Sequence, residues 1–482
     1  MILKGPSTRE REAPSPLDCA MTSSIDFVRK SCDRTQTAGD DTLERAAFTP
    51  SPSVMPRVRP IAHRVTMELD GEPVIAELGE PVAVALIGAG VLALARSPKF
   101  HRPRGPACLR GACDGCLARV DGVPNVMTCR IPAAAGMRIE VQNVVGSRET
   151  DLLRMADWFF PDGMNHHELF AGVPGLERAV QPLARRVAGL GTLPEASGRM
   201  ALAARRRDAD VLVVGSGPGG MAAAVELAKR GRSVEVIDDD LHAGGCARVL
   251  AEAGDATWRA LLDAFDDAVA GVRVTLRLRT TAAGIYGRDL VVSSSSGRDR
   301  IEVVTARTLV LAPGAHDGTL AFEGNDTPGV MSARAACRLA MHGVIPGERA
   351  VVLAVDGSGA FASAYAAADP RASLVRGTPL RVTGGARVAR QGRVRKVTLA
   401  TPEGERDLPC DALVIDAARS PAYELCQQAG AALLRESAGF VVQCQAGGRI
   451  GDGVFAIGEV TGASLDPDAI GRAAREIADA AG

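Results

Sequence analysis

One βαβ pattern constrains the fold of this chain more than any other feature. From Asp208 the sequence reads DADVLVVGSGPGGMAAAVELAKRGRSVEVID, in which an apolar strand runs into glycines, a helix follows, and a second apolar strand ends in an acid. This order predicts a Rossmann-like α/β domain. Gly215, Gly217 and Gly220 form G-x-G-x-x-G at the first turn, where glycines allow a tight turn, close approach of a pyrophosphate and close helix–strand packing.

Asp238 ends the second strand of this pattern, eighteen residues after Gly220. A carboxylate at this place accepts hydrogen bonds from the ribose of a bound adenosine. The motif therefore predicts a whole dinucleotide rather than a phosphate alone. A glycine-rich turn without a ligand is the alternative, and the order of strand, helix and acid counts against it.

Three cysteines lie in the stretch CLRGACDGC, well ahead of this unit, and a fourth follows in VMTCR. Thiolates are soft ligands, so four close together select zinc, an iron–sulfur cluster or copper(I). Zinc sites usually show two paired knuckles, whereas C-x4-C-x2-C with one distant cysteine is the spacing of a plant-type [2Fe–2S] ferredoxin loop. Zinc or chance clustering is the alternative. The expected cluster ligands are Cys108, Cys113, Cys116 and Cys129.

Glycines around these cysteines support a cluster. The sulfur atoms of a cluster accept hydrogen bonds from backbone amides that turn inward with no side chain in the way, and Gly105, Gly111 and Gly115 allow this. The other cysteines are scattered singly. Cys246 stands alone and no C-x-x-C pair follows a glycine loop, so the dithiol of a disulfide reductase is missing.

The residues around the cysteine loop predict a small α+β domain of the β-grasp ferredoxin kind. Alternating stretches turn at Asp70-Gly71 and at Asp121-Gly122, which predicts two β-hairpins. An uncharged run over 81–95 predicts a buried helix, and the stretch MRIEVQN predicts a last strand.

Charge and hydropathy exclude several classes of partner. The formal net charge is −1, with 56 basic and 57 acidic residues, so nothing indicates nucleic acid or a charged membrane surface. The run 81–95 is shorter than the roughly 20 apolar residues that span a bilayer, and no signal peptide is evident at the start of the sequence. A cytoplasmic protein is expected.

Two later stretches resemble markers of two-dinucleotide-domain flavoproteins of the glutathione-reductase type. They are ARTLVLAPGA at 306–315 and DGVFAIGEV at 452–460. The resemblance implies that the dinucleotide is FAD. In that family an Asp facing the ribityl chain stands where this chain has Glu459. The residues expected to bind FAD are Gly215, Gly217, Pro218, Gly219, Gly220, Asp238, Gly245, Gly314 and Glu459.

The same resemblance places an NAD-binding domain between the two markers, and ERAVVLAVDGSGAFASAYAAAD at 348–369 lies where it would begin. Ala354 or Val355 takes the place of the first glycine, and Asp356 puts a carboxylate near the expected pyrophosphate. No acidic ribose partner is evident after the next strand. We therefore expect a degenerate domain that keeps its fold, with NAD(P) binding unlikely.

These patterns together predict five segments. The first has a composition typical of disorder, and translation that starts at Met55 or Met67 is the alternative for it. The expected segments are a disordered N-terminal extension (1–58), a [2Fe–2S] ferredoxin-like domain (59–148), a helical connector (149–205), an FAD-binding domain (206–340 and 440–482) and the degenerate NAD(P)-binding-like domain (341–439).

Over roughly residues 60–482 the chain resembles the amino-terminal half of sarcosine oxidase α subunits and the related FAD subunits of hydrogen cyanide synthase and opine dehydrogenases. The stretches SPKFHRPRG, FEGNDTPGVM and ERAVVLAV carry this resemblance beside the FAD loop. Two departures stand out. Those α subunits generally lack the cluster cysteines, and they continue into a folate-binding aminomethyltransferase-like half, whereas this sequence stops at Gly482.

The resemblance implies that the chain is one subunit of an oxidoreductase for CH–NH donors. A partner resembling D-amino-acid oxidases would oxidise a secondary amine or amino acid such as sarcosine, proline or an opine, and this chain would carry electrons between FAD and the cluster. No catalytic acid or base stands out. The alternatives are a stand-alone NAD(P)H-dependent ferredoxin-type reductase and a scaffold subunit with reduced cofactor binding.

Overall fold

The structure is a computed structural model that describes residues 57–98, 100–155, 204–294, 300–355, 359–384, 392–437 and 439–482. The chain divides into Met1–Thr49 and Pro50–Gly482, and every described element belongs to the second unit. Nearly all of the expected N-terminal extension and most of the expected connector lie outside the described residues. No helix in the described ranges is long and apolar enough to cross a bilayer.

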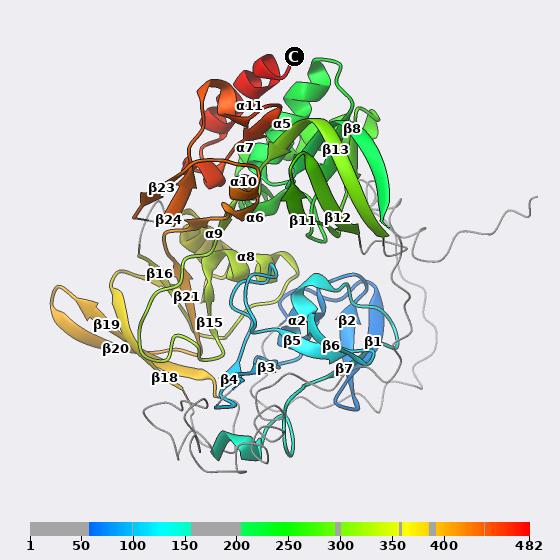
Figure 1. The fold of residues 1–482 in the computed structure, drawn as a ribbon. Coiled ribbons are helices and arrows are strands. Elements are labelled where there is room, and N and C mark those ends of the chain that lie inside the picture. Colours follow the sequence, from blue (N-terminus) through cyan, green and yellow to red (C-terminus); the bar gives the residue numbers. More distant parts are fainter. Residues whose placement is uncertain are drawn as a thin grey trace, which may run out of the picture. The chain divides into compact units, whose positions relative to one another are not determined.

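A five-stranded sheet with strand order β2-β1-β7-β5-β6 forms the first domain (Figure 1). Both predicted hairpins are present, because β1 pairs antiparallel with β2 and β5 with β6. Asp70 and Asp121 take positive φ angles of 52° and 47° at the two turns, which is the conformation that Asp-Gly turns require. The strands are β1 (Arg64–Leu69), β2 (Glu72–Glu77), β5 (Leu117–Val120), β6 (Val123–Met127) and β7 (Arg138–Glu140), and β3 (Ala95–Arg96) pairs with β4 (Pro103–Arg104).

The helix expected over 81–95 is shorter in the structure and spans only α2 (Val82–Gly88). Gly90 takes a left-handed φ of 85° just beyond it, and glycine in that conformation ends helices. Residues 91–94 then continue as buried, non-helical chain. The prediction was right about burial and wrong about length, because apolar composition alone does not show where a helix stops.

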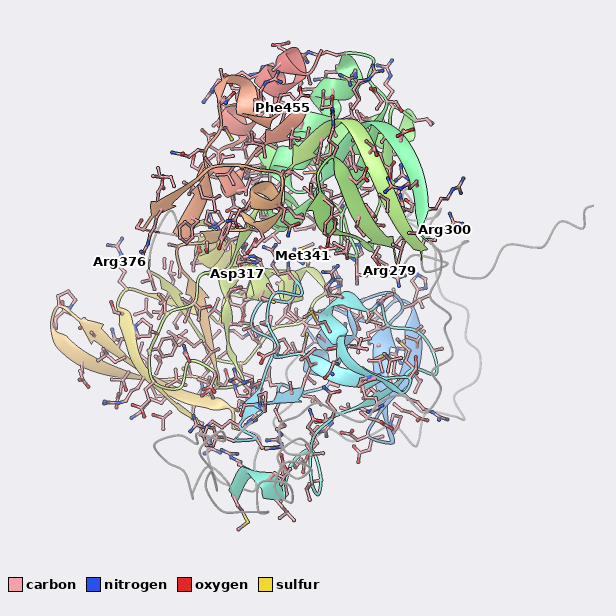
Figure 2. The ribbon with its side chains drawn as sticks, in the orientation of Figure 1. Arg279, Arg300, Asp317, Met341, Arg376 and Phe455 are labelled. Atoms are coloured by element: carbon pink, nitrogen blue, oxygen red, sulfur yellow. The ribbon has the colours of Figure 1, made fainter. Side chains whose placement is uncertain are left out.

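The central sheet of the chain has the order β10-β9-β8-β13-β12-β11, and β26 also pairs with β13. Strands β10, β9, β8, β13 and β26 run parallel, as the βαβ pattern predicted, and the side chain of Phe455 on β26 is buried in it (Figure 2). The elements are β8 (Arg205–Val214), α5 (Pro218–Lys229), β9 (Val234–Ile237), α6 (Gly245–Glu252), α7 (Ala256–Ala270), β10 (Val274–Arg277), β11 (Thr280–Tyr286), β12 (Asp289–Ser294), β13 (Arg300–Leu311), β25 (Arg449–Gly451), β26 (Val454–Ala456) and α11 (Pro467–Ala480).

A second, smaller parallel sheet has the order β15-β21-β16-β17. The first strand of this sheet along the chain is β15 (Val330–Ser332), so the chain enters the sheet before the domain boundary at residue 341 that the sequence suggested. The buried side chains of Cys426 and Val442 pack with the core of the central sheet, so the chain also returns before 440. The elements are β14 (Ala315–His316), β15 (Val330–Ser332), α8 (Ala333–Met341), β16 (Ala350–Ala354), α9 (Ala360–Ala368), β17 (Ser373–Val375), β18 (Thr378–Gly384), β19 (Val394–Thr401), β20 (Gly404–Pro409), β21 (Ala412–Asp416), β22 (Ser420–Pro421), α10 (Glu424–Gln428), β23 (Leu433–Glu436) and β24 (Gly439–Val442).

Candidate functional site

The four cysteines of the predicted cluster come together as two pairs. The Sγ atoms of Cys108 and Cys113 are 3.4 Å apart, and the thiols of Cys116 and Cys129 are hydrogen-bonded to each other. In the described residues no three His, Cys, Asp or Glu side chains converge as a single-ion site. Two pairs fit a [2Fe–2S] cluster, in which each iron takes two protein ligands, better than a zinc ion surrounded by all four.

Backbone amides point at the sulfur atoms of this loop. The amides of Arg110 and Ala112 donate to Cys108 Sγ at 3.4 and 3.3 Å. Two of the glycines singled out in the sequence make the loop possible. A Cβ on Gly115 would lie 1.9 Å from the carbonyl oxygen of Gly105, and Gly111 takes a φ of 78°. The loop is therefore shaped for inward-facing amides, as iron–sulfur sites require.

One thiol of each pair is poised to lose its proton. The hydrogen bond from Cys108 lowers the pKa of Cys113 to about 6, despite the opposing effect of burial. The hydrogen bond with Cys129 likewise lowers the pKa of Cys116. In each pair the partner that donates has its pKa raised. Since the thiolate is the metal-binding form, these residues fit the cluster that their spacing predicts.

The predicted pyrophosphate cradle lies between β8 and α5. Gly215 has a φ of 98°, and a Cβ there would lie 2.3 Å from the carbonyl oxygen of Ala312. A Cβ on Gly220 would lie 1.8 Å from the carbonyl oxygen of Gly215, whereas a Cβ on Gly217 would meet nothing within 4 Å. Gly217 therefore faces open space directly before Pro218, the first residue of α5, where a helix N-terminus attracts a phosphate.

Asp238 follows β9 and reaches back to the glycine loop. Its Oδ2 accepts hydrogen bonds from the amide and hydroxyl of Ser216 at 2.6 and 2.7 Å. Burial raises the pKa of Asp238, the nearby charge of Asp240 adds to this, and the bonds from Ser216 oppose it. The carboxylate is thus fixed at the edge of the cradle, as a ribose partner must be.

A cavity of about 250 Å³ is lined by residues of the glycine cradle and by Asp238. Most of the residues predicted to bind FAD line it. Gly219 and Gly220 do not: Gly219 packs against Ile457, and Gly220 against Gly215. Their role is to let α5 approach its neighbours closely. The predicted residues that line the cavity are Gly215, Gly217, Pro218, Asp238, Gly245, Gly314 and Glu459.

Arginines that the sequence analysis did not single out also line this cavity. Arg110 comes from the cysteine loop, while Arg334 and Arg338 lie one turn apart on α8. Arg338 donates to Asp240 Oδ2 at 2.8 Å and to the carbonyl oxygen of Leu109 at 3.3 Å. The i, i+4 spacing on an otherwise apolar helix was the available signal, but it does not show which cavity a helix faces.

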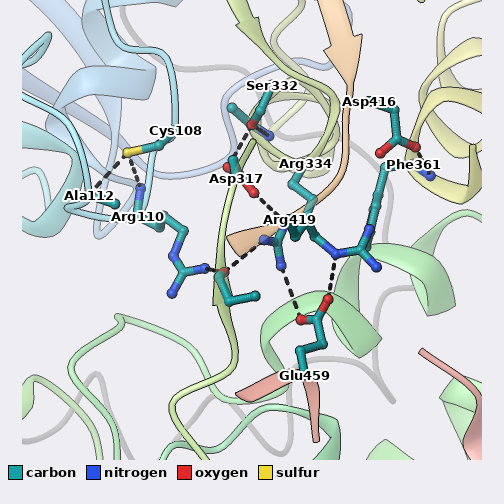
Figure 3. A network of polar contacts seen from close by, with 12 residues as sticks. Cys108, Arg110, Ala112, Asp317, Ser332, Arg334, Phe361, Asp416, Arg419 and Glu459 are labelled. Atoms are coloured by element: carbon teal, nitrogen blue, oxygen red, sulfur yellow. Dashed lines mark hydrogen bonds and ion pairs between the residues drawn. The ribbon is translucent and has the colours of Figure 1, made fainter. Parts of the chain in front are cut away.

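Glu459, which stands where the flavoprotein family has Asp, is held from two sides. Arg334 pairs with its Oε2 at 3.4 Å and Arg419 with its Oε1. Figure 3 shows the network, in which Arg334 also pairs with Asp317. The guanidinium groups of Arg334 and Arg419 lie 5.6 and 5.3 Å from the ring centre of Phe361, a cation–π geometry. Glu459 is therefore a fixed wall of the cavity and not a mobile side chain.

The second sheet differs at the place where a nucleotide would bind. The amides of Phe361 and Ala362, in the first turn of α9, both donate to Asp416 Oδ2 at 3.0 Å (Figure 3). The chain's own carboxylate thus occupies the helix N-terminus that would otherwise face a pyrophosphate. Burial raises the pKa of Asp416, although the two amide bonds oppose this. Asp356, which the sequence analysis placed near this point, lies outside the described residues.

Two family models match the chain. The one described as "2Fe-2S iron-sulfur cluster binding domain" matches residues 62–144, and the one described as "Pyridine nucleotide-disulphide oxidoreductase" matches residues 209–375. The sarcosine oxidase α subunit of Rhizobium meliloti (strain 1021) is 28% identical over 319 residues, which are 61% of this chain and 32% of that protein. Over this part the chain is similar to sarcosine oxidase α subunits.

Two other similar proteins agree with the resemblance seen in the sequence. An opine oxidase subunit from Agrobacterium tumefaciens (strain Ach5) is 32% identical over 163 residues, 30% of this chain and 31% of that protein. The hydrogen cyanide synthase subunit HcnB of Pseudomonas aeruginosa is 33% identical over 129 residues, 25% of this chain and 27% of that protein. The chain spans about a third of the length of these curated relatives.

A solved structure confirms the fold. L-proline dehydrogenase from P. horikoshii superposes with a TM-score of 0.65 at 20% identity, covering 88% of this chain and 74% of that one. With the two family models, this confirms the predicted class, a two-dinucleotide-domain flavoprotein fold joined to a ferredoxin-like domain. The matches also confirm an oxidoreductase with the predicted cofactor pair, FAD and a [2Fe–2S] cluster.

Proposed function

We propose that this chain passes electrons between FAD and a [2Fe–2S] cluster, and that they come from oxidation of a secondary amine or amino acid by a partner subunit in the cytoplasm. One observation carries the proposal. The cavity that contains the glycine cradle is also lined by Arg110, a residue of the cysteine loop. Arg110 thus belongs both to the cysteine loop and to the lining of the cavity, which supports direct electron transfer between the two proposed cofactor sites.

The substrate class rests on the relatives. Sarcosine oxidase and opine oxidase are named for sarcosine and for opines, and each matched relative is named as a subunit of a larger enzyme. A D-amino-acid-oxidase-like partner would supply the acid–base chemistry for which this sequence offers no evident residues. The proposed FAD ligands are the cradle glycines with Asp238 and Glu459, and the proposed cluster ligands are the four cysteines.

The occupied helix N-terminus of α9 favours this proposal over an NAD(P)H-dependent reductase. Asp416 holds the amides that would bind a nicotinamide dinucleotide. A negative charge at this point repels a pyrophosphate and competes for the same donors. We therefore propose that the second sheet no longer binds NAD(P) and that NAD(P)H does not supply the electrons.

Anaerobic stopped-flow mixing of the chain with its native partner tests the proposal. Sarcosine, proline or an opine should bleach the flavin and then produce the electron paramagnetic resonance signal of a reduced [2Fe–2S] cluster. The control is Cys129→Ser, which removes one ligand; with FAD added to saturation it should still show flavin bleaching but no cluster signal. Rapid bleaching by NADH with none by an amine would establish the reductase alternative, and a chain isolated without flavin would establish the scaffold.

A further inference from the structure

Arg110 connects the cysteine loop to the FAD cavity, which its side chain lines. Its backbone amide donates to Cys108 Sγ at 3.4 Å, so the residue is positioned by the cluster loop. Its guanidinium extends away from Cys108 (Figure 3). It donates to the carbonyl oxygen of Ala315 on β14. One residue thus touches a proposed cluster ligand at one end and the flavin cavity at the other.

The guanidinium of Arg110 has more donors than its bond to Ala315 uses. A guanidinium carries several N–H donors in a planar fork, and only Nη1 is engaged by the carbonyl oxygen of Ala315. Within the described residues no carboxylate pairs with it directly, since the nearby Asp317 is bound by Arg334. Arg110 is partly buried, and a cation withdrawn from water without a carboxylate partner is costly, which points to an anionic or acceptor group that completes the site.

The other arginines at this junction are already satisfied by carboxylates. Arg338 pairs with Asp240 at 2.8 Å, and Arg130, next to Cys129, pairs with Asp239 at 2.7 Å. Arg130 does not line the cavity. In the part of the chain that the structure describes, Arg110 is therefore the cation that faces the cavity without a paired acid, and it is supplied by a different domain from the glycine cradle.

We propose that Arg110 completes the FAD site from the ferredoxin-like domain, so that the binding of FAD and the state of the cluster are thermodynamically coupled. This rests on the proposed function and deepens it. When FAD is bound, the free donors of Arg110 bind an acceptor of the cofactor. The cluster fixes the loop that carries Arg110, so loss of the cluster weakens FAD binding, and by reciprocity FAD changes the properties of the cluster.

The first experiment measures the FAD dissociation constant by flavin fluorescence in cluster-loaded protein. Arg110→Met should bind FAD about tenfold to a hundredfold more weakly, the range expected for a charge-assisted hydrogen bond. Arg110→Lys keeps the charge and should recover part of the loss. The matched control is Arg138→Met, which removes an exposed arginine from β7 of the same domain and should leave FAD affinity unchanged.

The second experiment removes the cluster from the wild-type chain with a chelator and repeats the titration. FAD affinity should fall toward that of Arg110→Met, and the same treatment should change little in Arg110→Met itself. Equal affinity with and without the cluster would overturn the coupling. The comparison of wild-type protein with and without the cluster needs no substitution. It therefore tests the coupling between cluster and FAD binding even if Arg110→Met fails to load iron.

The third experiment measures the cluster instead of the flavin. Arg110→Met removes a positive charge beside Cys108, so the midpoint potential of the cluster should fall. The fall is about 59 mV for each tenfold decrease in the equilibrium constant for one-electron reduction of the cluster. Arg138→Met should not shift it. A wild-type chain that holds neither FAD nor iron would refute the proposed function; a chain that holds both, with affinity and potential unchanged in Arg110→Met, would refute only the role of Arg110.

Discussion

The two parallel sheets of this chain treat one helix N-terminus in opposite ways: that of α5, between β8 and β9, and that of α9, between β16 and β17. At α5, Gly217 faces open space in a cavity of about 250 Å³. At α9, the carboxylate of Asp416 fills the corresponding place and takes the amides of Phe361 and Ala362. The same local dipole can bind a ligand or be neutralised from within. A fold alone therefore does not show whether a dinucleotide binds; the residue in front of the helix does.

The largest effect is expected when the N-terminus of α5 is given a carboxylate like the one at α9. Gly217→Asp places a carboxylate at the open cradle, where it repels the pyrophosphate, and FAD affinity should fall at least about a thousandfold, or about 4 kcal/mol. The fold should survive because a Cβ at Gly217 meets nothing within 4 Å. Flavin content and thermal unfolding of the FAD-free protein measure the two effects.

Gly217→Ser is the control for this substitution, since it adds a small polar side chain without the charge. It should retain much more flavin than Gly217→Asp. Equal flavin content in wild type and Gly217→Asp would show that the cofactor does not use this cradle.

The converse change removes the internal ligand of α9. Asp416→Ala leaves two buried amides without an acceptor, and each lost partner costs about 1–3 kcal/mol. We expect the free energy of unfolding to fall by about 2–3 kcal/mol in urea denaturation. Asp416→Asn keeps an acceptor oxygen and should lose less. A variant Asp416→Ala as stable as wild type would mean that the cap carries no structural role.

A more moderate effect is expected at Asp238, because this carboxylate is proposed to make one contact with FAD, at the ribose. Burial raises its pKa in the protein without ligand, so the carboxylate is charged only above that raised value. FAD affinity should therefore increase as the pH rises through this pKa and level off above it. Asp238→Asn should lower the affinity about tenfold at pH values above this pKa and flatten the pH profile, as followed by fluorescence titration. A profile of the same slope in both proteins would assign the titration to another group.

The smallest effect is expected at Glu459. Glu459→Asp restores the residue typical of the flavoprotein family and moves the carboxylate by one methylene while keeping its negative charge beside Arg334 and Arg419. FAD affinity should change by about threefold or less, that is below about 0.7 kcal/mol, in the same fluorescence titration. Glu459→Gln removes the charge that both arginines share and should cost more. A large loss in Glu459→Asp would show that its length is specific to this cavity.

Motifs confined to one stretch of sequence could be predicted well. The cluster ligands and the glycine cradle depend on backbone geometry within a few residues of each other, so Gly115 and Gly220 reveal their close contacts through spacing alone. The hairpins at Asp70 and Asp121 were found for the same reason.

Features that depend on tertiary contacts could not be predicted. Arg110 and Arg334 reach the cavity from different domains, and no local pattern shows where a long side chain ends. The place of β15 in the second sheet depends on its pairing with β21, some eighty residues away. The cap on α9 was missed because Asp416 lies in a distant strand, and the acid that the sequence analysis singled out, Asp356, lies outside the described residues.

The three consecutive acids after β9 each have a different partner. Asp238 holds Ser216, Asp239 pairs with Arg130, and Asp240 pairs with Arg338. Three residues span at most about 7 Å from first to last Cα, so the ribose-side carboxylate and the contacts beside Cys129 are tied to one short piece of backbone. Under the proposed function, a ferredoxin-like domain tethered in this way would be a stationary relay, and electrons would cross a gap whose width is built into the polypeptide rather than left to diffusion.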